Sequence, residues 1–329
     1  MIMIQSLLKL FAKLWVTLTS VIGSLMVFGL MMLIVVLASS HKESLRYPTR
    51  VVHEGDDEQI AIISLSGEIL AEDINNDPLA FSSGVISAKR VVALLDQVLL
   101  QDEIKAVVLR INSPGGAVVA SDEIYQKVKE VNAKKPIIVS FGDVAASGGY
   151  YISSGASEII ANPATLTGSI GVIAQFPKYD ELLAKVGVQM RTIKSGEFKD
   201  IGSPDREMTD SEKVIFQTMI NESYDQFIGA IVKGRNMDEA TVRRLADGRI
   251  YTGKQAKENG LVDELGTEAL ALDHAKVKAH LKNPTIIEFT GGGFLSTLLG
   301  SSLQNINPFA QVSSVLPQTR SGVYYLMSF

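Results

Sequence analysis

Short apolar runs alternate along the chain with segments in which apolar residues recur every three or four positions. The runs at residues 60–65, 106–111 and 137–140 are rich in Ile and Val and predict strands. The intervening segments 87–101 and 117–132 have the spacing of helices with one apolar face, which would cover a sheet. This alternation predicts an α/β fold.

The second half of the chain continues the same alternation. Asp210 is the predicted N-cap of a long helix, because an Asp side chain can accept a hydrogen bond from the free backbone amides of the first turn. We expect strands at residues 158–161 and 188–193, and helices at residues 178–186, 211–233, 237–246 and 267–281.

An uncharged stretch near the N-terminus, residues 14–40, predicts a transmembrane helix. It exceeds the ~20 residues that cross a bilayer. Its apolar centre, residues 25–37, is at the upper limit of the roughly 7–15 apolar residues of a cleavable signal peptide. We therefore expect an uncleaved anchor with residues 1–13 in the cytoplasm. The alternative is a signal sequence cleaved at the small residues 38–40, and in both cases the rest of the chain would be exported.

The exported part has three predicted regions. The polar, aperiodic residues 41–58 are typical of a stalk, residues 59–281 of a folded domain, and residues 282–329, rich in Gly, Ser, Asn and Pro, of a tail. The end of the tail, residues 323–327, is apolar and β-prone. It could add as a strand at a peptide-binding groove, or pack as a final strand against the domain or a neighbouring subunit.

Composition narrows the chemistry. Of the 329 residues, 46% are hydrophobic and 20% charged, which is typical of a folded protein. A net charge of −5 without a basic stripe argues against a nucleic-acid partner. The absence of cysteine excludes thiolate nucleophiles, disulfides and cysteine-ligated metals. The chemistry must therefore use oxygen and nitrogen groups, and we expect neither a metal nor a cofactor.

Two glycine-rich turns follow predicted strands and open predicted helices, at residues 112–116 and 145–149. Free amides at such positions can hold an anion or a developing oxyanion. Neither turn has the residues of a phosphate-binding loop. In the second turn, small residues surround Ser147 and leave room for a peptide carbonyl. Ser147 is thus a candidate nucleophile, although a helix N-cap would use the same residue type.

A serine nucleophile needs a general base. The four histidines are poorly placed for this role, because His41 and His53 lie in the anchor and stalk region and His274 and His280 on the last predicted helix. Lys199, in a loop containing Gly and Ser, is the alternative base, and a solvated lysine is the competing interpretation.

The glycine-rich turns, the Lys199 loop and three further motifs resemble those of one protease family. The sequence resembles the signal peptide peptidase A family, membrane-anchored serine–lysine proteases of the ClpP/crotonase fold, over residues 60–281. The matching segments are Asn112-Ser-Pro-Gly-Gly116, residues 142–150, Thr167-Gly-Ser-Ile-Gly-Val172, residues 194–204, and residues 251–263 with Gly260-Leu-Val-Asp263.

The resemblance implies that Ser147 is the nucleophile and Lys199 the general base, with Ser169 bonded to the lysine. It further implies that Gly115 or Gly116 supplies an oxyanion-hole amide together with Gly148. The expected protein is a homo-oligomeric ring in the cell membrane, the inner or plasma membrane. It would be single-pass, with its catalytic domain on the extracytoplasmic side, and would degrade cleaved signal peptides and other apolar peptides.

A lysine base must be neutral, whereas a lysine side chain in water titrates near 10.4, so desolvation has to favour the uncharged amine. Asp200 would oppose this if it faced Lys199, and we expect it to point away. Two alternatives stay open. One is a crotonase-like acyl-CoA enzyme, which would also use an oxyanion hole, and the other is a non-catalytic membrane scaffold.

Overall fold

The structure is a computed structural model that describes residues 13, 15, 17, 19–33, 47–72, 84–290 and 323–326. The chain divides into two units, Met1–Arg46 and Tyr47–Phe329. The expected stalk residues 41–46 and the tail residues 291–322 and 327–329 lie outside the described residues.

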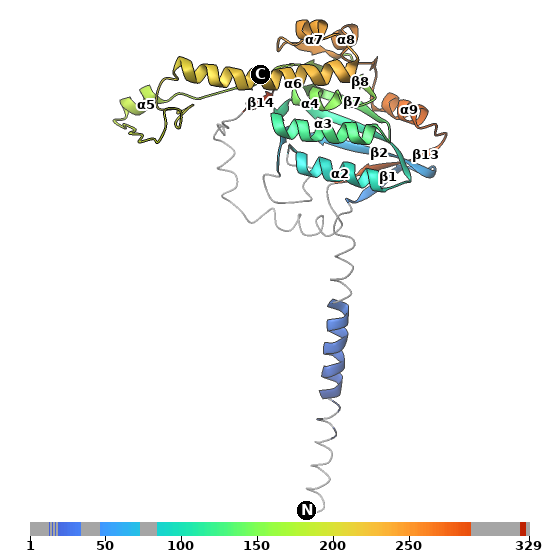
Figure 1. Ribbon diagram of the computed structural model, residues 1–329. Helices are drawn as coiled ribbons and strands as arrows, with labels where there is room; N and C mark the ends of the chain where they lie inside the picture. The colour runs from blue at the N-terminus through green and yellow to red at the C-terminus, as the bar shows by residue number, and fades with distance from the viewer. Residues whose placement is uncertain are drawn as a thin grey trace, which may run out of the picture. The chain divides into compact units, whose positions relative to one another are not determined.

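The larger unit is built on a mixed sheet that contains nine of the described strands (Figure 1). The path runs β1-β13-β2-β5-β7-β8-β12, and β9 pairs with both β7 and β11. The central strands β2, β5, β7 and β8 are parallel neighbours. The bounds are β1 Thr49–His53, β2 Asp56–Ser66, β5 Ile104–Ser113, β7 Ile137–Ala146, β8 Glu158–Ala161, β9 Leu166–Gly168, β11 Ile250–Thr252, β12 Glu264–Leu265 and β13 Pro284–Phe289.

Helices cover both faces of this sheet, which explains why its central strands are apolar without alternation. In β2, Ile60 and Ile62 pack toward α9, whereas Ala61 and Ile63 belong to the larger core with α2 and α3. The helix bounds are α2 Ala88–Leu100, α3 Val118–Asn132, α4 Gly148–Ser153, α5 Asp180–Lys185, α6 Asp210–Arg235, α7 Glu239–Leu245, α8 Gly253–Glu258 and α9 Glu268–Lys278.

A second, smaller sheet has the order β10-β14-β6-β3-β4 among the described strands. Its members are short, and β14 comes from the C-terminal tail. The strand predicted near the end of the tail is thus present, and it lies between two strands of the domain. The bounds are β3 Glu68–Leu70, β4 Val85–Ser87, β6 Gly115–Ala117, β10 Ile173–Ala174 and β14 Val323–Leu326.

Residues 176–219 project from the body of the larger unit, and we call them the arm (Figure 1). The arm comprises α5, the loop that follows it and the first part of α6. Its own packing is limited to contacts such as the ring pair Phe176 and Phe216, whose centroids are 4.2 Å apart. Ion pairs from Arg206 to Asp200 and Glu212 hold the loop against the start of α6.

Most expected helices and strands are confirmed, and four details differ. Residues 188–193, predicted as a strand, form none. They are exposed, and no strand in the described part of the chain pairs with them. The N-cap of α6 is Thr209 rather than Asp210, since Thr209 and Glu212 form a capping box. Strand β1 lies within the range expected for the stalk, and β13 within the range expected for the tail.

The smaller unit contains a helix at residues 19–33, all of whose side chains are exposed. Among the described residues, no helix is both long enough and apolar enough to cross a membrane. Several residues of the expected span 14–40 lie outside the described residues.

Candidate active site

Ser147 stands at the sharp turn where β7 ends and α4 begins. Its backbone has φ 51° and ψ −116°, a conformation that costs a residue with a Cβ about 1–3 kcal/mol. The backbone amide of Ser147 donates to the carbonyl oxygen of Gly168 at 2.8 Å, which pins the turn to β9. Such a strained strand-to-helix turn is the geometry that presents a nucleophilic serine in hydrolases.

The hydroxyl of Ser147 has no hydrogen-bond partner among the described residues, although the residue is fully buried. The side chain also does not cap α4. A buried hydroxyl without a partner costs about 1–3 kcal/mol. Ser147 thus occupies the N-cap position, but its side chain does not cap the helix, so the prediction of a capping side chain is wrong. Packing does not explain why a hydroxyl without a partner is buried here.

The two glycine turns meet beside Ser147. The amide of Gly148 is the first of α4 and has no partner within that helix. A Cβ built on Gly148 would lie 3.2 Å from the nitrogen of Gly116, so the amides of Gly116 and Gly148 are neighbours. The Gly115 amide instead donates to Ser113 Oγ at 3.1 Å. Of the two expected candidates in the first turn, Gly116 is thus better placed to share an anion with Gly148.

Glycine is required at these positions. A Cβ on Gly115 would stand 2.0 Å from the carbonyl oxygen of Tyr325 and 2.7 Å from the nitrogen of Gly148. A Cβ on Gly116 would stand 2.0 Å from the carbonyl oxygen of Ile69. Both clashes are with backbone and cannot be relieved by a change of rotamer.

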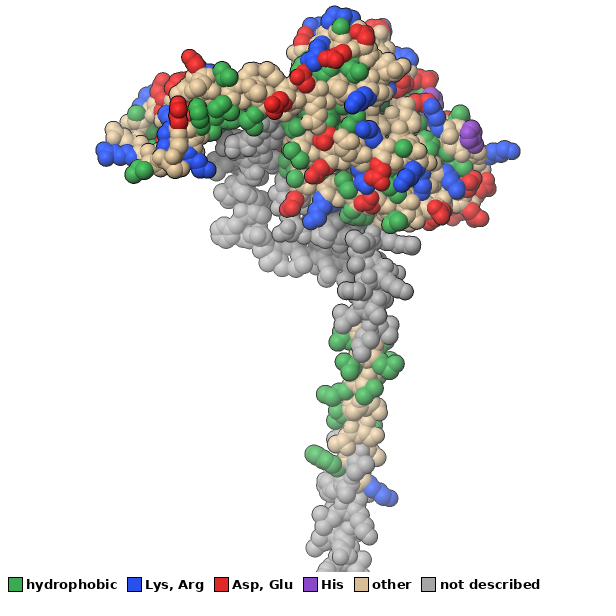
Figure 2. Space-filling model, viewed as in Figure 1, with side chains coloured by type: hydrophobic (Ala, Val, Ile, Leu, Met, Phe, Trp, Pro, Cys, Tyr) green, Lys and Arg blue, Asp and Glu red, His purple; other side chains and the backbone are tan. Residues whose placement is uncertain are grey.

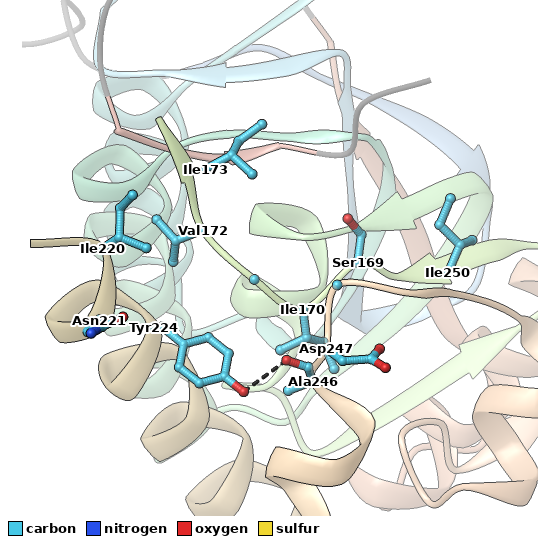
Figure 3. A pocket seen from close by; sticks show the side chains of 12 residues that line it. Ser169, Ile170, Val172, Ile173, Ile220, Asn221, Tyr224, Ala246, Asp247 and Ile250 are labelled. Atoms are coloured by element: carbon cyan, nitrogen blue, oxygen red, sulfur yellow. Dashed lines mark hydrogen bonds between the residues drawn. The ribbon is translucent and has the colours of Figure 1, made fainter. Parts of the chain in front are cut away.

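Ser169 is brought beside Ser147 by strand pairing. Parallel strands β7 and β9 align Ala146 with Gly168, so the residues that follow, Ser147 and Ser169, lie next to each other. Ser169 lines a cavity of about 470 Å³ with Ile170, Ile220 and other residues (Figure 3). Among the described residues that line this cavity, Asp247 carries the only charge, and its carboxylate pairs with Arg249. No lysine or histidine lines the cavity among those residues.

Lys199 lies in the arm, whose outer end with α5 is remote from α4 (Figure 1). The residue is exposed, and no hydrogen bond among the described residues joins it to Ser147 or Ser169. The carboxylate of Asp200 accepts from Lys194 at 2.7 Å and from Arg206 at 2.9 Å, so its ion-pair partners are residues other than Lys199. These partners, Arg206 first, hold the pKa of Asp200 well below its usual range.

His274, on α9, is bonded to carboxylates of the sheet. His274 Nδ1 lies 2.6 Å from Glu158 Oε2, and its Nε2 lies 3.4 Å from Glu264 Oε2. Both partners are on neighbouring strands, β8 and β12. The bond therefore ties α9 to the sheet, as expected for a histidine in a packing role.

An aromatic pocket next to Ser147 was missed by the sequence analysis. The ring of Tyr325, from β14, is fully buried against Tyr151 at 5.1 Å and Phe227 at 4.8 Å between centroids. Its hydroxyl donates to the carbonyl oxygen of Ser223 at 2.7 Å. Burial raises the pKa of Tyr325. In the sequence, Tyr151 and Phe227 are indistinguishable from ordinary core residues. The apolar tail residues 323–327 were the one sequence feature that indicated a strand near this pocket.

Comparison with known proteins identifies the family of the chain. Residues 129–282 match the profile of peptidase family S49, and residues 81–167 match that of Clp protease. The chain is 41% identical over 232 residues to a candidate protease of Methanocaldococcus jannaschii, covering 70% of this chain and 74% of that protein.

Two further relatives carry more specific names. One, from Enterococcus faecium, is named as a candidate signal peptide peptidase SppA, with 40% identity over 74% of this chain and 71% of that protein. The other is the chloroplastic serine protease SPPA of Arabidopsis thaliana, with 34% identity over 72% of this chain and 35% of that protein. With its mixed α/β, Clp-like fold, the chain belongs to peptidase family S49, the serine proteases that include signal peptide peptidase A.

Proposed function

We propose that the protein is a membrane-anchored endopeptidase in which Ser147 is the nucleophile and Lys199 the general base. The observation that carries the proposal is the buried Ser147 hydroxyl without a described partner, on a strained turn beside the Gly116 and Gly148 amides. A non-catalytic scaffold would gain nothing from backbone strain at residue 147 or from a buried hydroxyl without a partner. A nucleophile at this position has two oxyanion donors, the Gly116 and Gly148 amides, beside it.

In the proposed reaction, Ser147 Oγ attacks a peptide carbonyl while the neutral amine of Lys199 takes the hydroxyl proton. The amides of Gly116 and Gly148 hold the negative oxygen of the tetrahedral intermediate. The carbon–nitrogen bond then breaks, and the leaving amine takes the proton back from Lys199. Water hydrolyses the resulting ester by the same path in reverse. Ser169 would accept a hydrogen bond from the lysine and orient it.

We propose that Lys199 reaches Ser147 of a second copy of the chain. The cavity that Ser169 lines contains no lysine or histidine among the described residues, while Lys199 is exposed on the arm. The arm also exposes apolar side chains, as Figure 2 shows, in a pattern typical of a surface that another protein covers. The exposed members are Tyr179, Leu182, Val186, Val188, Met190, Ile193, Phe198, Val214, Ile215 and Met219. Such contacts, repeated head to tail, would close a ring.

The proposed substrates are apolar peptides at the membrane, including signal peptides after their release. The proposed anchor is the uncharged stretch 14–40, of which the described helix 19–33 exposes only uncharged side chains. Residues 1–13 would lie in the cytoplasm and the peptidase domain on the extracytoplasmic side of the plasma membrane. An extended peptide suits this domain because β14 shows that the groove beside Gly116 accepts a strand. That observation favours a peptide over an acyl-CoA thioester.

The test uses a serine-reactive fluorophosphonate and a chromogenic peptide on detergent-solubilised full-length protein. Ser147→Ala should abolish labelling and lower peptide hydrolysis by on the order of 10⁴-fold or more. Ser153→Ala is the matched control, because that buried hydroxyl belongs to the same short helix but donates to the Gly149 carbonyl oxygen at 2.7 Å. Equal activity of Ser147→Ala and wild type would refute the nucleophile. Absence of labelling and hydrolysis in wild type would favour the scaffold.

A further inference from the structure

A short turn, Asp247-Gly248-Arg249, lies against the backbone that carries Ser169. The amide of Ser169 donates to the carbonyl oxygen of Arg249 at 2.8 Å. The amide of Gly248 donates in return to the carbonyl oxygen of Ile170 at 3.2 Å. Ser169 itself has φ 48°, in the left-handed region that residues with a Cβ seldom occupy. The two hydrogen bonds therefore hold the turn beside Ser169 and support the unusual backbone of this residue.

The turn brings one carboxylate to the cavity beside Ser169. Asp247 and Ser169 line the same cavity, together with the apolar side chains of Ile170 and Ala246 (Figure 3). Asp247 carries the only charged side chain among the described residues that line it. A carboxylate at this place favours the protonated form of any amine that enters the cavity.

The guanidinium of Arg249 neutralises this carboxylate. Arg249 Nε donates to Asp247 Oδ1 at 2.7 Å and to Oδ2 at 2.9 Å, and Arg249 Nη2 also donates to Oδ2. The backbone amide of Arg249 donates to Asp247 Oδ1 at 3.2 Å. These bonds, that of the Arg249 side chain first, hold the pKa of Asp247 below its usual range. Both members of the pair therefore stay ionised near neutral pH, and their charges cancel.

Two tyrosines beside the cavity add no charge. The hydroxyl of Tyr224 donates to the carbonyl oxygen of Ala246 at 2.8 Å, the bond drawn in Figure 3. The hydroxyl of Tyr251, on β11, donates to the carbonyl oxygen of Leu245 at 2.9 Å. Burial raises the pKa of both tyrosines, so neither ionises near neutral pH.

The other charged groups near the cavity are paired elsewhere. Arg243, on α7, lies over the ring of Tyr224 and forms ion pairs with Asp225 and Glu239. The arm of a second copy would bring further charges with Lys199, and its Asp200 already pairs with two cations. The charged neighbours of Lys199 on the arm are Lys194, Glu197, Asp200 and Arg206. The Asp247–Arg249 pair is therefore the one whose carboxylate lines the cavity itself.

We propose that the Asp247–Arg249 ion pair keeps the lysine base of Ser147 in its neutral form, because Arg249 cancels a carboxylate that would otherwise favour the protonated amine. The inference rests on the proposed function, since it takes Lys199 of a second copy as the base that binds at Ser169. Arg249 and Asp247 act through the lysine and do not touch the substrate. They are therefore positioning residues, which set the pH at which the dyad works.

The two members of the pair have opposite expected effects. Arg249→Gln leaves the Asp247 carboxylate without its cation, so the protonated lysine is favoured and activity begins at a higher pH. Asp247→Asn leaves the guanidinium without its anion, so the protonated lysine is disfavoured and activity begins at a lower pH. An asparagine oxygen can still accept from the Arg249 amide, so this variant keeps the shape of the turn.

The expected shift is modest. A charge in direct contact with a titrating group moves its midpoint by roughly 1–3 pH units. Asp247 and Arg249 are both exposed in the single chain, so water and salt screen them. We therefore expect each substitution to move the midpoint of the acid limb by about 0.5–1 pH unit.

The experiment measures two rates against pH with full-length protein in detergent. One is kcat/KM for a chromogenic peptide, and the other is the rate at which a fluorophosphonate labels Ser147. We expect the acid limb of both profiles to move up in Arg249→Gln and down in Asp247→Asn. The double variant should return close to wild type, and Arg249→Lys, which keeps the charge, should move less than half as far as Arg249→Gln.

The control is Asp273→Asn, which breaks an exposed ion pair with Lys276 on α9 and should leave both profiles unchanged. Thermal unfolding shows whether each variant is folded. If Arg249→Gln does not fold, Asp247→Asn makes the test alone, because its acid limb must move down.

A purely structural role of the turn would lower activity at every pH and move no midpoint. Unchanged midpoints in both single variants, or shifts of both in the same direction, overturn the inference. If wild type is labelled and active in that case, the proposed function stands. Wild type that is neither labelled nor active, or a fully active Lys199→Ala, overturns the proposed function and the inference together.

Discussion

The strain at Ser147 can be measured by comparing two substitutions at this one position. Ser147→Ala and Ser147→Gly both remove the hydroxyl, so any hydrogen bond that it makes is lost equally from both. The variants differ in whether residue 147 has a Cβ, which makes φ 51°, ψ −116° costly. The difference in their free energies of unfolding therefore reports backbone strain.

The expected magnitude follows from two opposing contributions. A residue with a Cβ in this conformation costs about 1–3 kcal/mol. Glycine loses more conformational entropy on folding, by about 0.5–1 kcal/mol. We therefore expect Ser147→Gly to be more stable than Ser147→Ala by about 1 kcal/mol. In a domain of this size that difference raises Tm by about 2–4 °C.

The assay is thermal or denaturant unfolding of both variants under identical conditions. The same pair at Thr218, exposed in the middle of helix α6, is the control. There glycine should be less stable than alanine by about 1 kcal/mol, because the backbone is helical. If Ser147→Gly proved no more stable than Ser147→Ala, residue 147 would not be strained, and the argument that this turn is kept for catalysis would fail.

Two further predictions concern the arm. If Lys199 acts on Ser147 of another copy, mixing Ser147→Ala and Lys199→Ala subunits at equal ratio should restore about a quarter of wild-type activity, since half of the serines and half of the lysines are intact. Background activity after verified subunit exchange would place both groups in one chain. The pKa of Glu212 is lowered to about 2, first by Arg206 and then by the Thr209 amide. Its contribution to stability is therefore present above its ordinary pKa near 4.5 and is lost as the pH falls toward 2. Unfolding curves between pH 5 and pH 2 should show a smaller loss for Glu212→Gln than for wild type, and equal losses would contradict this.

The central strands could be predicted from sequence because both of their faces are buried. Strands β2, β5 and β7 each contain a continuous apolar run. Strand β1 could not be found in this way, because all five of its side chains are exposed and it is held by pairing with β13. Residues 188–193 were wrongly predicted to be a strand. Their apolar side chains suggested burial, but they are exposed on the arm and pair with no strand among the described residues.

In the candidate active site, too, some features could be predicted from the sequence and others could not. Ser147 was a candidate because small residues surround it at the end of a predicted strand, but its role as nucleophile came from the family resemblance. The choice of Gly116 over Gly115 required the structure, because it depends on the hydrogen bond from Gly115 to Ser113. The pocket of Tyr151 and Phe227 is built from residues far apart in the sequence, and only folding brings them together.

If peptide substrates bind beside Gly116, β14, which is part of the same chain, would compete with them as a tethered ligand. A tethered ligand has an effective concentration on the order of millimolar, and dilution of the enzyme does not lower it. The tethered strand would raise the KM of every free peptide by the same factor and leave kcat unchanged. An enzyme with this kinetics spares dilute chains and acts where apolar peptides are concentrated, as they are within the plane of a membrane.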